Sequence, residues 1–451
     1  SVNLPDDVVE NIFSFLPIKQ AIQMGVTSKR LKKSWVLSRN LYFDREFARV
    51  LGRPDFIKII NRVFALHEGP KVDVFRLCFG PAQGDECLVN SWINKCVKKN
   101  VEELDFDFCE ARKPFNISSD LLDAESIRVL KFSYCNLQLA PKLNGLRLLN
   151  TLVLRRANIT ISTIDSLLNN CLFLENLDIA LSYISHLKIH AQNLRNFKVL
   201  KIGECQDLIR IDIDAPTLRS FLYSGKLCFF KIGYISQLNN VMVNFSPSKI
   251  LSLQHFNVGK LMSDFSHVEV LTVTSTFIEA LCSRIMDSHL TKLRFCLMNL
   301  KEFQLFMKGA RYCNLYDIAS FLKNCYCIER VFIDLTNFSF ECGRYCEMHQ
   351  QQLIEQFPLL FSHLKFITIK GFKFHKHELE MVKFFLQKAI HLENLALVAP
   401  KYNRSKMSPQ DLLIFEKIFR YWRASPRADI VTYEHFNDRS PFNPMHSKSW
   451  H

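Results

Sequence analysis

Glycine and proline are scarce in this chain, with 13 and 15 residues among 451. That scarcity excludes collagen-like, linker-rich and low-complexity proteins. No uninterrupted apolar run approaches the roughly 18–20 residues that a membrane-spanning helix requires. The first residues, SVNLPDDVVEN, lack the order of basic, apolar and small residues that marks a secretory signal peptide. We therefore expect a soluble protein of the cytoplasm, the nucleus or both, with no membrane-bound part.

The sequence motifs of common catalytic sites are also missing. The chain has no Walker-type phosphate loop, no Gly-x-Ser-x-Gly elbow and no His-Glu-x-x-His zinc helix. One group of residues could be compared with a zinc site, but it lacks a pair of Cys-x-x-Cys elements: Cys325, Cys327, Cys342, Cys346 and His349. No two carboxylates are placed by sequence as an acid and a base. We expect no catalytic residues, no metal and no cofactor.

Hydrophobic residues make up 48% of the chain, enough to bury a large core, and the formal net charge is +14. The 15 cysteines lie mostly inside apolar strings, where reduced cysteine behaves as a small hydrophobic residue. An excess of positive charge favours acidic partners such as nucleic acid, an anionic membrane, an acidic protein or an anionic ligand. The simpler interpretation, which we favour, is a basic surface spread over a large protein.

Residues 1–40 differ in texture from the rest of the chain, because three helical patterns are packed into a short stretch. Pro5 suits the first position of a helix whose apolar residues recur every four positions, at Val8, Ile12 and Leu16. Pro17 ends this helix and can open the next one. Ser28 can cap a third helix that contains Trp35. About forty residues bury too little surface to be stable alone, so one face of this unit should pack against something else.

From about residue 100 onward, short strings alternate apolar and other residues, which is the pattern of half-buried strands. Examples are ELDFDFC, VLKFSYC, TLVLRRAN, NLDIALS, HLKIHA, RIDIDAP, KLRFC and FITIKGF. Intervals of roughly 22–28 residues between strings contain helical patterns, as leucine-rich repeats do. The shorter intervals between 186 and 224 leave room only for a turn or loop. The fold predicted is an α/β solenoid with a curved parallel sheet, preceded by a small all-helical unit. A doubly wound sheet is disfavoured by the absence of a Gly-rich phosphate turn.

Several segments resemble one family when they are taken in order. LPDDVVENIFSFLPIKQAIQMGVTSKRLKKSW resembles the F-box, apart from valine at positions 8 and 9 where leucine is commoner. VFALHEGPKVDVFRLCF, SWINKCVKKNVEELDFDF and NTLVLRRANITISTIDSLLNNCLFLENLDIA resemble the segments that follow it in plant F-box/leucine-rich-repeat/FBD proteins. FPLLFSHLKFITIKGFKFHKHELEMVKFFLQKAIHLENLALVAPK resembles their C-terminal FBD segment. Each match is weak alone, but the co-linear order over residues 1–435 is specific.

The resemblance implies a domain organisation. We expect an F-box at 1–45, a helical linker and cap at 46–100, and leucine-rich repeats at 101–356. FBD-like repeats and a cap follow at 357–435. The remaining 436–451 have no family counterpart, and their Pro, Ser and Asn content predicts a poorly ordered tail.

The resemblance also implies a function: the substrate-receptor subunit of an SCF-type cullin ubiquitin ligase, in which a partner enzyme transfers the ubiquitin. The F-box would dock on a Skp-type adaptor and, through it, on a cullin. The expected adaptor contacts are Leu4, Pro5, Val8, Ile12, Leu16, Pro17, Ile18, Met24 and Trp35. About half of these could instead pack only against the F-box's own helices. The basic run Lys29, Arg30, Lys32 and Lys33 could complement an acidic adaptor, act as a nuclear-localisation patch, or form a plain solvated helix face.

The repeats would present the surface that binds an unknown target protein. Candidate residues are Arg155, Arg156, Lys188, His190, Lys201 and Arg294. Two alternatives use the same positive charge. One is a receptor in which a small molecule or an inositol phosphate completes the target surface. The other is a basic nucleic-acid-binding repeat protein, which is disfavoured because the basic residues are dispersed among the repeats.

Overall fold

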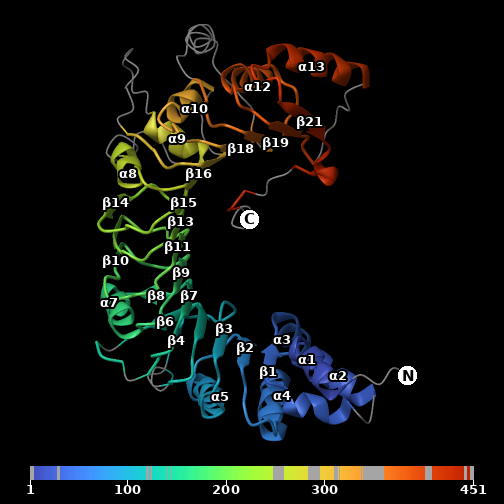
Figure 1. Cartoon of the computed structure of the whole chain (residues 1–451). Coiled ribbons are helices and arrows are strands. Elements are labelled where there is room, and N and C mark those ends of the chain that lie inside the picture. The colour runs from blue at the N-terminus through green and yellow to red at the C-terminus, as the bar shows by residue number, and fades with distance from the viewer. Residues whose placement is uncertain are drawn as a thin grey trace. The chain divides into compact units, whose positions relative to one another are not determined.

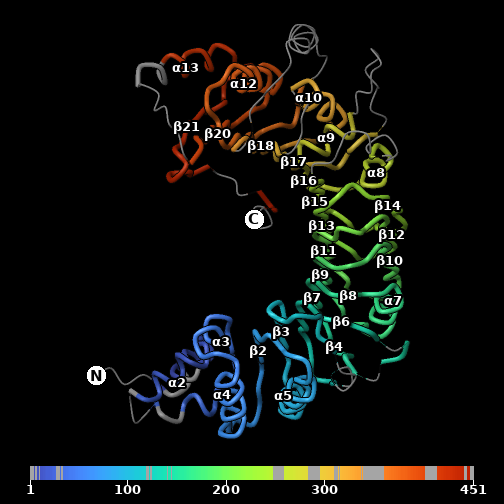
Figure 2. The backbone as a smooth tube through the Cα atoms, turned by 180° about the vertical axis from the view of Figure 1, so that it is seen from behind, coloured from blue at the N-terminus to red at the C-terminus, as the bar shows by residue number. Residues whose placement is uncertain are grey.

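The structure is a computed structural model, and it describes residues 5–27, 31–117, 121, 124–139, 141–143, 145–246, 258–282, 295–308, 313, 315–336, 338, 360–401, 409–440 and 444–446. The chain divides into two compact units. Unit 1 contains residues 1–218 and 233–236, and unit 2 contains residues 219–232 and 237–451. Figures 1 and 2 show the elements of both units from opposite sides.

Unit 1 begins with the predicted group of small helices: α1 (Asp6–Ser14), α2 (Ile18–Thr27) and the 3-10 helix η1 (Leu31–Leu37). Val9, Phe13 and Ala21 form its buried centre. Leu16, Leu31 and Trp35 are partly buried against that centre. The apolar face of α1 therefore supplies the core of a unit that spans fewer than forty residues.

The parallel sheet begins earlier than predicted. Strand β1 (Asn40–Phe43) lies inside the segment expected to be all-helical, and it pairs with β2 (Val74–Cys78) inside the expected linker. Helices α3 (Arg45–Leu51) and α4 (Arg53–Leu66) connect these two strands, and α5 (Glu86–Lys98) follows β2. The sequence pattern missed β1 and β2 because each shows only a short alternation next to strong helical signals.

The rest of the main sheet in unit 1 has one strand per repeat. Its strand order is β1-β2-β3-β5-β7-β9-β11, and the pairs are parallel. The later strands are β3 (Glu103–Asp107), β5 (Val129–Ser133), β7 (Thr151–Arg155), β9 (Asn176–Ala180) and β11 (Val199–Gly203). Residues at even places in these strands are buried, so the odd places form the open face of the sheet. Helix α7 (Ile161–Asn170) lies between β8 and β9 in the chain.

Two small additional sheets were not predicted. Strands β4 (Phe115–Asn116), β6 (Cys135–Leu137) and β8 (Asn158–Ile159) form one of them. In unit 1 the strings HLKIHA and RIDIDAP form β10 (His186–His190) and β12 (Arg210–Asp214), which pair with each other rather than with the main sheet. The strands and the short turns between them agree with the prediction, but β10 and β12 do not belong to the one curved sheet that was expected. Alternation identifies a strand, but it does not identify the strand's partner.

Unit 2 continues the same construction, with the strand order β13-β15-β16-β17-β18-β19-β20-β21. These strands are β13 (Ser220–Gly225), β15 (Asn240–Phe245), β16 (Val270–Thr274), β17 (Glu302–Phe306), β18 (Arg330–Asp334), β19 (Phe366–Lys370), β20 (Asn394–Val398) and β21 (Asp429–Tyr433). The remaining elements are β14 (Phe229–Ile232), α8 (Val258–Asp264), α9 (Ser275–Leu281), α10 (Leu315–Leu322), α12 (Lys376–Lys388), α13 (Pro409–Trp422) and η3 (His435–Asn437). The α/β class and the repeated parallel strands agree with the prediction, although most of KLRFC lies outside the described residues.

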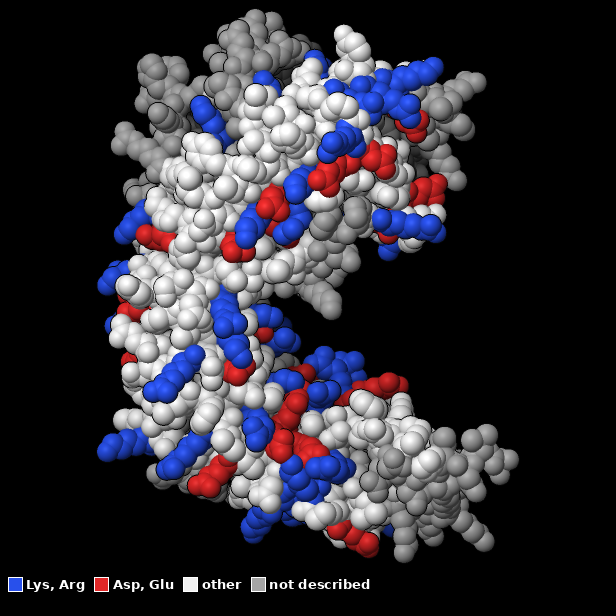
Figure 3. Space-filling model, in the orientation of Figure 1, with Lys and Arg blue, Asp and Glu red and all other residues white. Residues whose placement is uncertain are grey.

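The residue just before each strand of unit 2 forms a backbone ladder along one edge of the sheet. The amide of Lys301 donates to the carbonyl of Glu269 at 2.9 Å, and that of Glu329 donates to Lys301 at 2.9 Å. Lys365 and Glu393 repeat this contact in the next two repeats at 2.9 Å each. The charges of these residues alternate, and Lys301 Nζ lies 3.2 Å from Glu269 Oε2. Basic and acidic side chains also alternate in rows on the face drawn in Figure 3.

Gly371 ends β19 in a turn that no other residue would fit. Its φ is +73°, a conformation that L side chains rarely adopt. A Cβ atom at this position would lie 2.5 Å from the Cα of Thr336. The Gly-Phe turn of the FBD-like segment therefore needs glycine both for its backbone angle and for its close approach to the neighbouring chain. In the part of the chain that the structure describes, no helix has the length and apolar character to cross a bilayer.

Candidate binding surfaces

The N-terminal helices carry apolar side chains on their outer side. Val8, Ile12 and Phe15 are exposed along α1 and its end, and Phe15 is 77% exposed. Met24 and Val26 are exposed on α2, with Val26 81% exposed. Exposed apolar side chains grouped on a small helical unit indicate a binding surface, because contact with water is unfavourable for them.

The structure divides the predicted adaptor contacts into two groups. Pro5, Val8, Ile12 and Met24 are exposed, while Leu16, Pro17 and Trp35 are half-buried. Ile18 is 1% exposed, so in this structure its side chain belongs to the interior rather than to a surface open to a partner. Leu4 lies outside the described residues, as do Lys29 and Arg30, and the side chains of Lys32 and Lys33 are not described.

Two exposed residues were missed by the sequence analysis: Phe15 and Val26. The signal for Phe15 was present, because Val8, Ile12 and Phe15 follow the spacing i, i+4, i+7 of one helix face. A second stripe beside it, through Val9 and Phe13, is the one that packs inward. The two stripes were merged into one wide apolar face, and the sequence alone does not say which half is buried.

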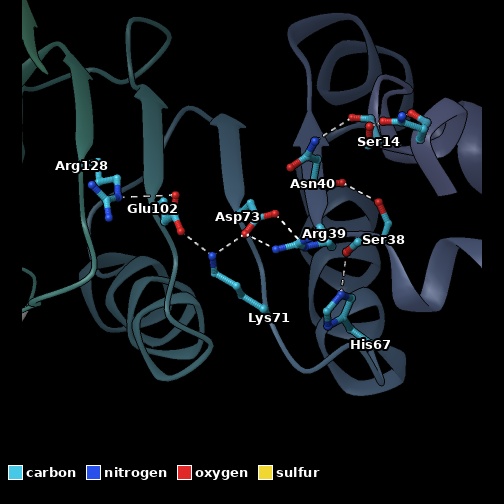
Figure 4. A network of polar contacts seen from close by, with 10 residues as sticks. Ser14, Ser38, Arg39, Asn40, His67, Lys71, Asp73, Glu102 and Arg128 are labelled. Carbon is cyan, nitrogen blue, oxygen red and sulfur yellow. Dashed lines mark hydrogen bonds and ion pairs between the residues drawn. The ribbon is translucent and has the colours of Figure 1, made fainter. Parts of the chain in front are cut away.

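A network of polar contacts joins these helices to the first strands, and Figure 4 shows its members facing one another. Asn40 Nδ2 donates to the carbonyl of Ser14 at 3.0 Å. Arg39 Nε lies 2.7 Å from Asp73 Oδ2, and Lys71 Nζ lies 2.8 Å from Asp73 Oδ1. Lys71 also pairs with Glu102 in the next repeat. The network therefore fixes the end of the helical unit against the start of the sheet.

His67 is the buried member of this junction. Its Nε2–H donates to the carbonyl of Ser38 at 2.8 Å, and its Nδ1 accepts from Lys99 Nζ at 2.7 Å. Lys99 also donates to the carbonyls of His67 and Gly69, at 3.0 and 2.9 Å. These partners require a neutral imidazole. Burial, followed by the charge of Lys99, lowers the pKa of His67 below its usual range, although the bond to Ser38 acts in the opposite direction. The Leu-His-x-Gly-Pro segment thus has a structural role in the linker.

The open face of the sheet in unit 1 is charged and internally paired. Arg76 Nε donates to Asp105 Oδ2 at 2.9 Å, and Lys131 Nζ donates to Glu103 Oε1 at 2.7 Å. Burial raises the pKa of Asp105, while Arg76 and Lys131 act to lower it. Arg76, Asp105 and Lys131 occupy one row across three neighbouring strands. Opposite charges in this row neutralise one another.

Only two of the predicted target-binding residues share this open face. Arg155 and Lys201 lie on β7 and β11, with β9 between them. Asp178 is the direct neighbour of Lys201 on β9, and burial raises its pKa while Lys201 and Arg155 act to lower it. The other predicted residues are elsewhere: Arg156 is in the turn after β7, Lys188 and His190 are on β10 of the smaller sheet, and Arg294 lies outside the described residues.

The open face of unit 2 has a different character. Met242, Thr272, Gln304, Phe332 and Thr368 occupy one row across five neighbouring strands, and all five are buried. None carries a charge. A row buried on this face of the sheet must be covered by another part of the chain.

Part of that cover is the end of the chain. Thr272 Oγ1 and His446 Nδ1 are 2.7 Å apart, and the amide of Met445 donates to Glu302 Oε1 at 3.1 Å. Earlier in the segment, Lys370 Nζ lies 3.0 Å from Asp438 Oδ2. Figures 1 and 2 both draw the end of the chain near β16. Within the segment 436–451, for which the composition predicts a poorly ordered tail, Asp438, Met445 and His446 thus make contacts across the fold that composition does not register.

Several cysteines are buried in apolar surroundings, which opposes formation of a reactive thiolate. Burial raises the pKa of Cys135 and Cys171 to about 12, and it raises the pKa of Cys325 strongly. Cys342, Cys346 and His349 lie outside the described residues. Among the residues that the structure places, no three His, Cys, Asp or Glu side chains are grouped so that they could hold a metal ion.

Comparison with known proteins identifies the family. The model described as "At1g61320/AtMIF1, LRR domain" matches residues 63–416, and that of the F-box domain matches residues 2–42. The chain belongs to the plant F-box/leucine-rich-repeat/FBD family. It is 35% identical over 417 residues to the putative FBD-associated F-box protein At1g61330 of Arabidopsis thaliana, covering 91% of this chain and 93% of that protein. It is 33% identical over 422 residues to the FBD-associated F-box protein At1g61320 of the same plant, covering 91% of each chain.

The family assignment agrees with the resemblance inferred from the sequence, and it gives the surfaces a context. The F-box match at 2–42 contains α1, α2 and η1, where the exposed apolar residues lie. The repeat match at 63–416 contains both open faces described above. This protein is an F-box and leucine-rich-repeat protein in which a helical end and a strand-built sheet offer separate surfaces.

Proposed function

We propose that this protein is the substrate receptor of an SCF-type cullin ubiquitin ligase. The F-box docks on a Skp-type adaptor, which links it to a cullin, and the repeats bind a target protein. The observation that supports this most directly is the exposed apolar stripe of Val8, Ile12 and Phe15 on α1, inside the segment that matches the F-box.

A helix that presents apolar residues at i, i+4 and i+7 can enter a hydrophobic groove of a partner. The adaptor-facing set is then Pro5, Val8, Ile12 and Met24 from the sequence analysis, joined by Phe15 and Val26. Ile18 is buried inside the unit, whereas Trp35 is half-buried, as Leu16 and Pro17 are. Leu16 and Pro17 lie at the border between the two groups.

The junction around His67 supports a receptor that works by orientation rather than by chemistry of its own. The hydrogen bonds from Asn40 and His67 and the ion pairs of Asp73 hold the F-box against the first repeats. A fixed junction would hold a bound target at a set position relative to the adaptor, and proximity of this kind accelerates a transfer that a partner enzyme carries out. This function would place the protein in the cytoplasm, the nucleus or both.

The two alternative functions find less support in the charged residues. Asp178 lies between Arg155 and Lys201 on the open face, where a carboxylate opposes the binding of an inositol phosphate. The basic residues Arg76 and Lys131 are paired with acidic neighbours rather than aligned as a track for nucleic acid.

The test is co-expression of the full chain with a plant Skp-type adaptor, followed by size-exclusion chromatography and calorimetry. The wild-type protein should form a one-to-one complex. The double variant I12D/F15D should weaken binding by about a hundredfold or more, because charged groups cannot enter an apolar groove. A matched control is L172D/F173D, which places the same charges at two exposed apolar residues after α7. Equal affinity of the two folded double variants for the adaptor would overturn the proposal.

A further inference from the structure

We infer that the open face of β16–β19 is a binding site for a short peptide, and that residues 444–446 occupy it in the isolated chain. The partner is a polypeptide segment of the type Pro-x-His, which would take the place of the chain's own segment. The site and its occupant both belong to unit 2. That the partner is a target protein rests on the function proposed above, but occupation by the chain's own segment does not.

The first support is the character of the contacts, which are those of a peptide ligand rather than of a folded element. Glu302 is 8% exposed, and its carboxylate accepts a hydrogen bond from the backbone amide of Met445 at 3.1 Å. His446 is also buried, and its ring pairs with Thr272 at 2.7 Å. One backbone contact and one side-chain contact at adjacent residues fix the position of this short turn on the sheet.

The second support is a built polar site on the sheet. Glu302 is held by Arg330 at 3.0 Å and also accepts from the side chain of Gln304. Gln304 is 0% exposed, and its Oε1 has no hydrogen-bond partner among the described residues. A buried carbonyl oxygen without a donor is costly. A partner peptide that supplied an additional N–H at this point would form a hydrogen bond to Gln304 that residues 444–446 do not provide.

The third support is incomplete filling next to Pro444. A cavity of about 20 Å³ lies between this proline and the residues Glu302, Arg330, Phe332, Phe366 and Thr368. That volume has room for about one water molecule. A partner with a somewhat larger apolar group at the position of Pro444 would fill this space and gain contacts. Residues 444–446 therefore cover the site without filling it completely, so a partner peptide that fills the cavity would make more contacts.

The length and position of the segment agree with this role. Lys370 pairs with Asp438, so the chain is held before the occupied site. Hydrogen bonds from Ser440 and Lys370 lower the pKa of Asp438 against the opposing effect of burial. Residues 444–446 can then bind as a tethered ligand at high local concentration. A partner in solution must overcome this local concentration.

The experiment uses a full-length variant, P444G/M445S/H446G, which removes the side chains that occupy the site and keeps the chain length. A fluorescent peptide with the sequence of residues 441–451 is titrated against it and against the wild-type protein. The variant should bind the peptide at least about tenfold more tightly than the wild type does, because the site is no longer covered by a tethered ligand. A peptide carrying His446→Ala should bind about fivefold more weakly, through loss of the hydrogen bond to Thr272.

Two further variants test whether the peptide binds at Thr272. T272V in the background of the triple variant should weaken peptide binding by about fivefold, whereas T151V in the same background, on the open face of β7, should leave it unchanged. Near-ultraviolet circular dichroism checks that each variant is folded. A folded triple variant that fails to bind the peptide, or a wild-type protein that binds it equally well, would overturn the inference. None of these measurements involves the adaptor, so failure of the proposed F-box docking would not alter them.

Discussion

The open faces of the two sheet segments are both built on parallel strands, but one row of side chains on each face differs in charge. In unit 1 the row through Arg76, Asp105 and Lys131 pairs charge with charge. In unit 2 the row through Thr272, Gln304 and Phe332 is uncharged and buried. The backbone hydrogen-bonding pattern of the two segments is parallel throughout, so the strands themselves do not cause the difference.

This difference indicates how one repeat architecture can offer two kinds of surface. Charged neighbours satisfy each other and tolerate water, so a face made of them needs no cover. Neutral and apolar neighbours leave polar atoms and apolar area that only another chain segment can cover. We therefore infer that the charged row of unit 1 stays exposed to solvent and acts through long-range electrostatics. The uncharged row of unit 2 is suited to direct packing against another chain segment.

The largest change in the free energy of unfolding is expected at a glycine whose backbone is packed closely against a neighbouring chain segment. Gly371 in unit 2 and Gly52 in unit 1 share a φ of +73°, but only Gly371 has backbone within reach of an added Cβ atom. Gly371→Ala should lower the free energy of unfolding by about 2–4 kcal/mol. Gly52→Ala should cost only the backbone strain of its φ of 73° and ψ of 157°, about 1–3 kcal/mol. Urea denaturation of the two variants measures both, and equal losses would mean that the packing at Thr336 does not matter.

The next test replaces glutamate by glutamine at equivalent positions on the two open faces. Glu302 and Glu103 are each the first residue of their strand and lie on the open face. Glu302→Gln should cost about 2 kcal/mol, because a buried carboxylate that accepts from Arg330 and Met445 loses its charge. Glu103→Gln should cost at most about 0.5 kcal/mol, since the side chain of Glu103 is more exposed than that of Glu302. Equal changes in the unfolding free energy would contradict the contrast between the faces.

The pH dependence tests the junction in unit 1. The pKa of His67 is lowered in the folded state, so between its usual value of about 6.5 and the lower folded value the unfolded chain binds more protons. Stability should be at its full value above about pH 6.5 and should fall as the pH drops below it. His67→Asn should remove this part of the slope, at a cost on the order of 1 kcal/mol at neutral pH from lost hydrogen bonds. The measurement is the unfolding midpoint of the wild type and of His67→Asn at several pH values. The same pH dependence in both proteins would mean that the junction does not depend on His67.

The smallest effect is expected on the charged face. Asp178→Asn should change the free energy of unfolding by no more than about 0.5 kcal/mol. It removes the carboxylate next to Lys201, so the protein should elute from a heparin column at higher salt than the wild type. Asp214→Asn, on β12 of the smaller sheet, is the matched control because it removes the same charge elsewhere. If both variants shift elution equally, only net charge matters and the face has no local preference.

The sequence was sufficient for the elements that depend on local patterns. Alternation over five residues located β3, β5, β7 and β9, because one buried face per strand leaves a period of two. Helical spacing located α1 and α2. The same pattern could not say that β10 and β12 pair in another sheet, because both sheets bury every second residue of their strands.

The candidate surfaces were harder to predict for a related reason. Which half of the α1 stripe is buried depends on where α2 and η1 pack, and helical spacing does not contain that information. The contact of His446 with Thr272 joins residues separated by most of unit 2. A short polar tail and a docked peptide have the same composition, so only the three-dimensional arrangement separates them.

The backbone ladder formed by the residues before the strands determines where residues can be inserted into the chain. Each rung of this ladder, such as the hydrogen bond from the amide of Lys301 to the carbonyl of Glu269 in the preceding repeat, fixes the first residue of the next strand. A residue inserted between a rung and its strand would exchange the buried and open faces of that strand. A residue inserted in the connection that leads back to the next rung would leave both faces intact. Such a protein can therefore acquire or lose connecting sequence over generations while every repeat keeps its orientation, so new binding loops can arise without rebuilding the sheet.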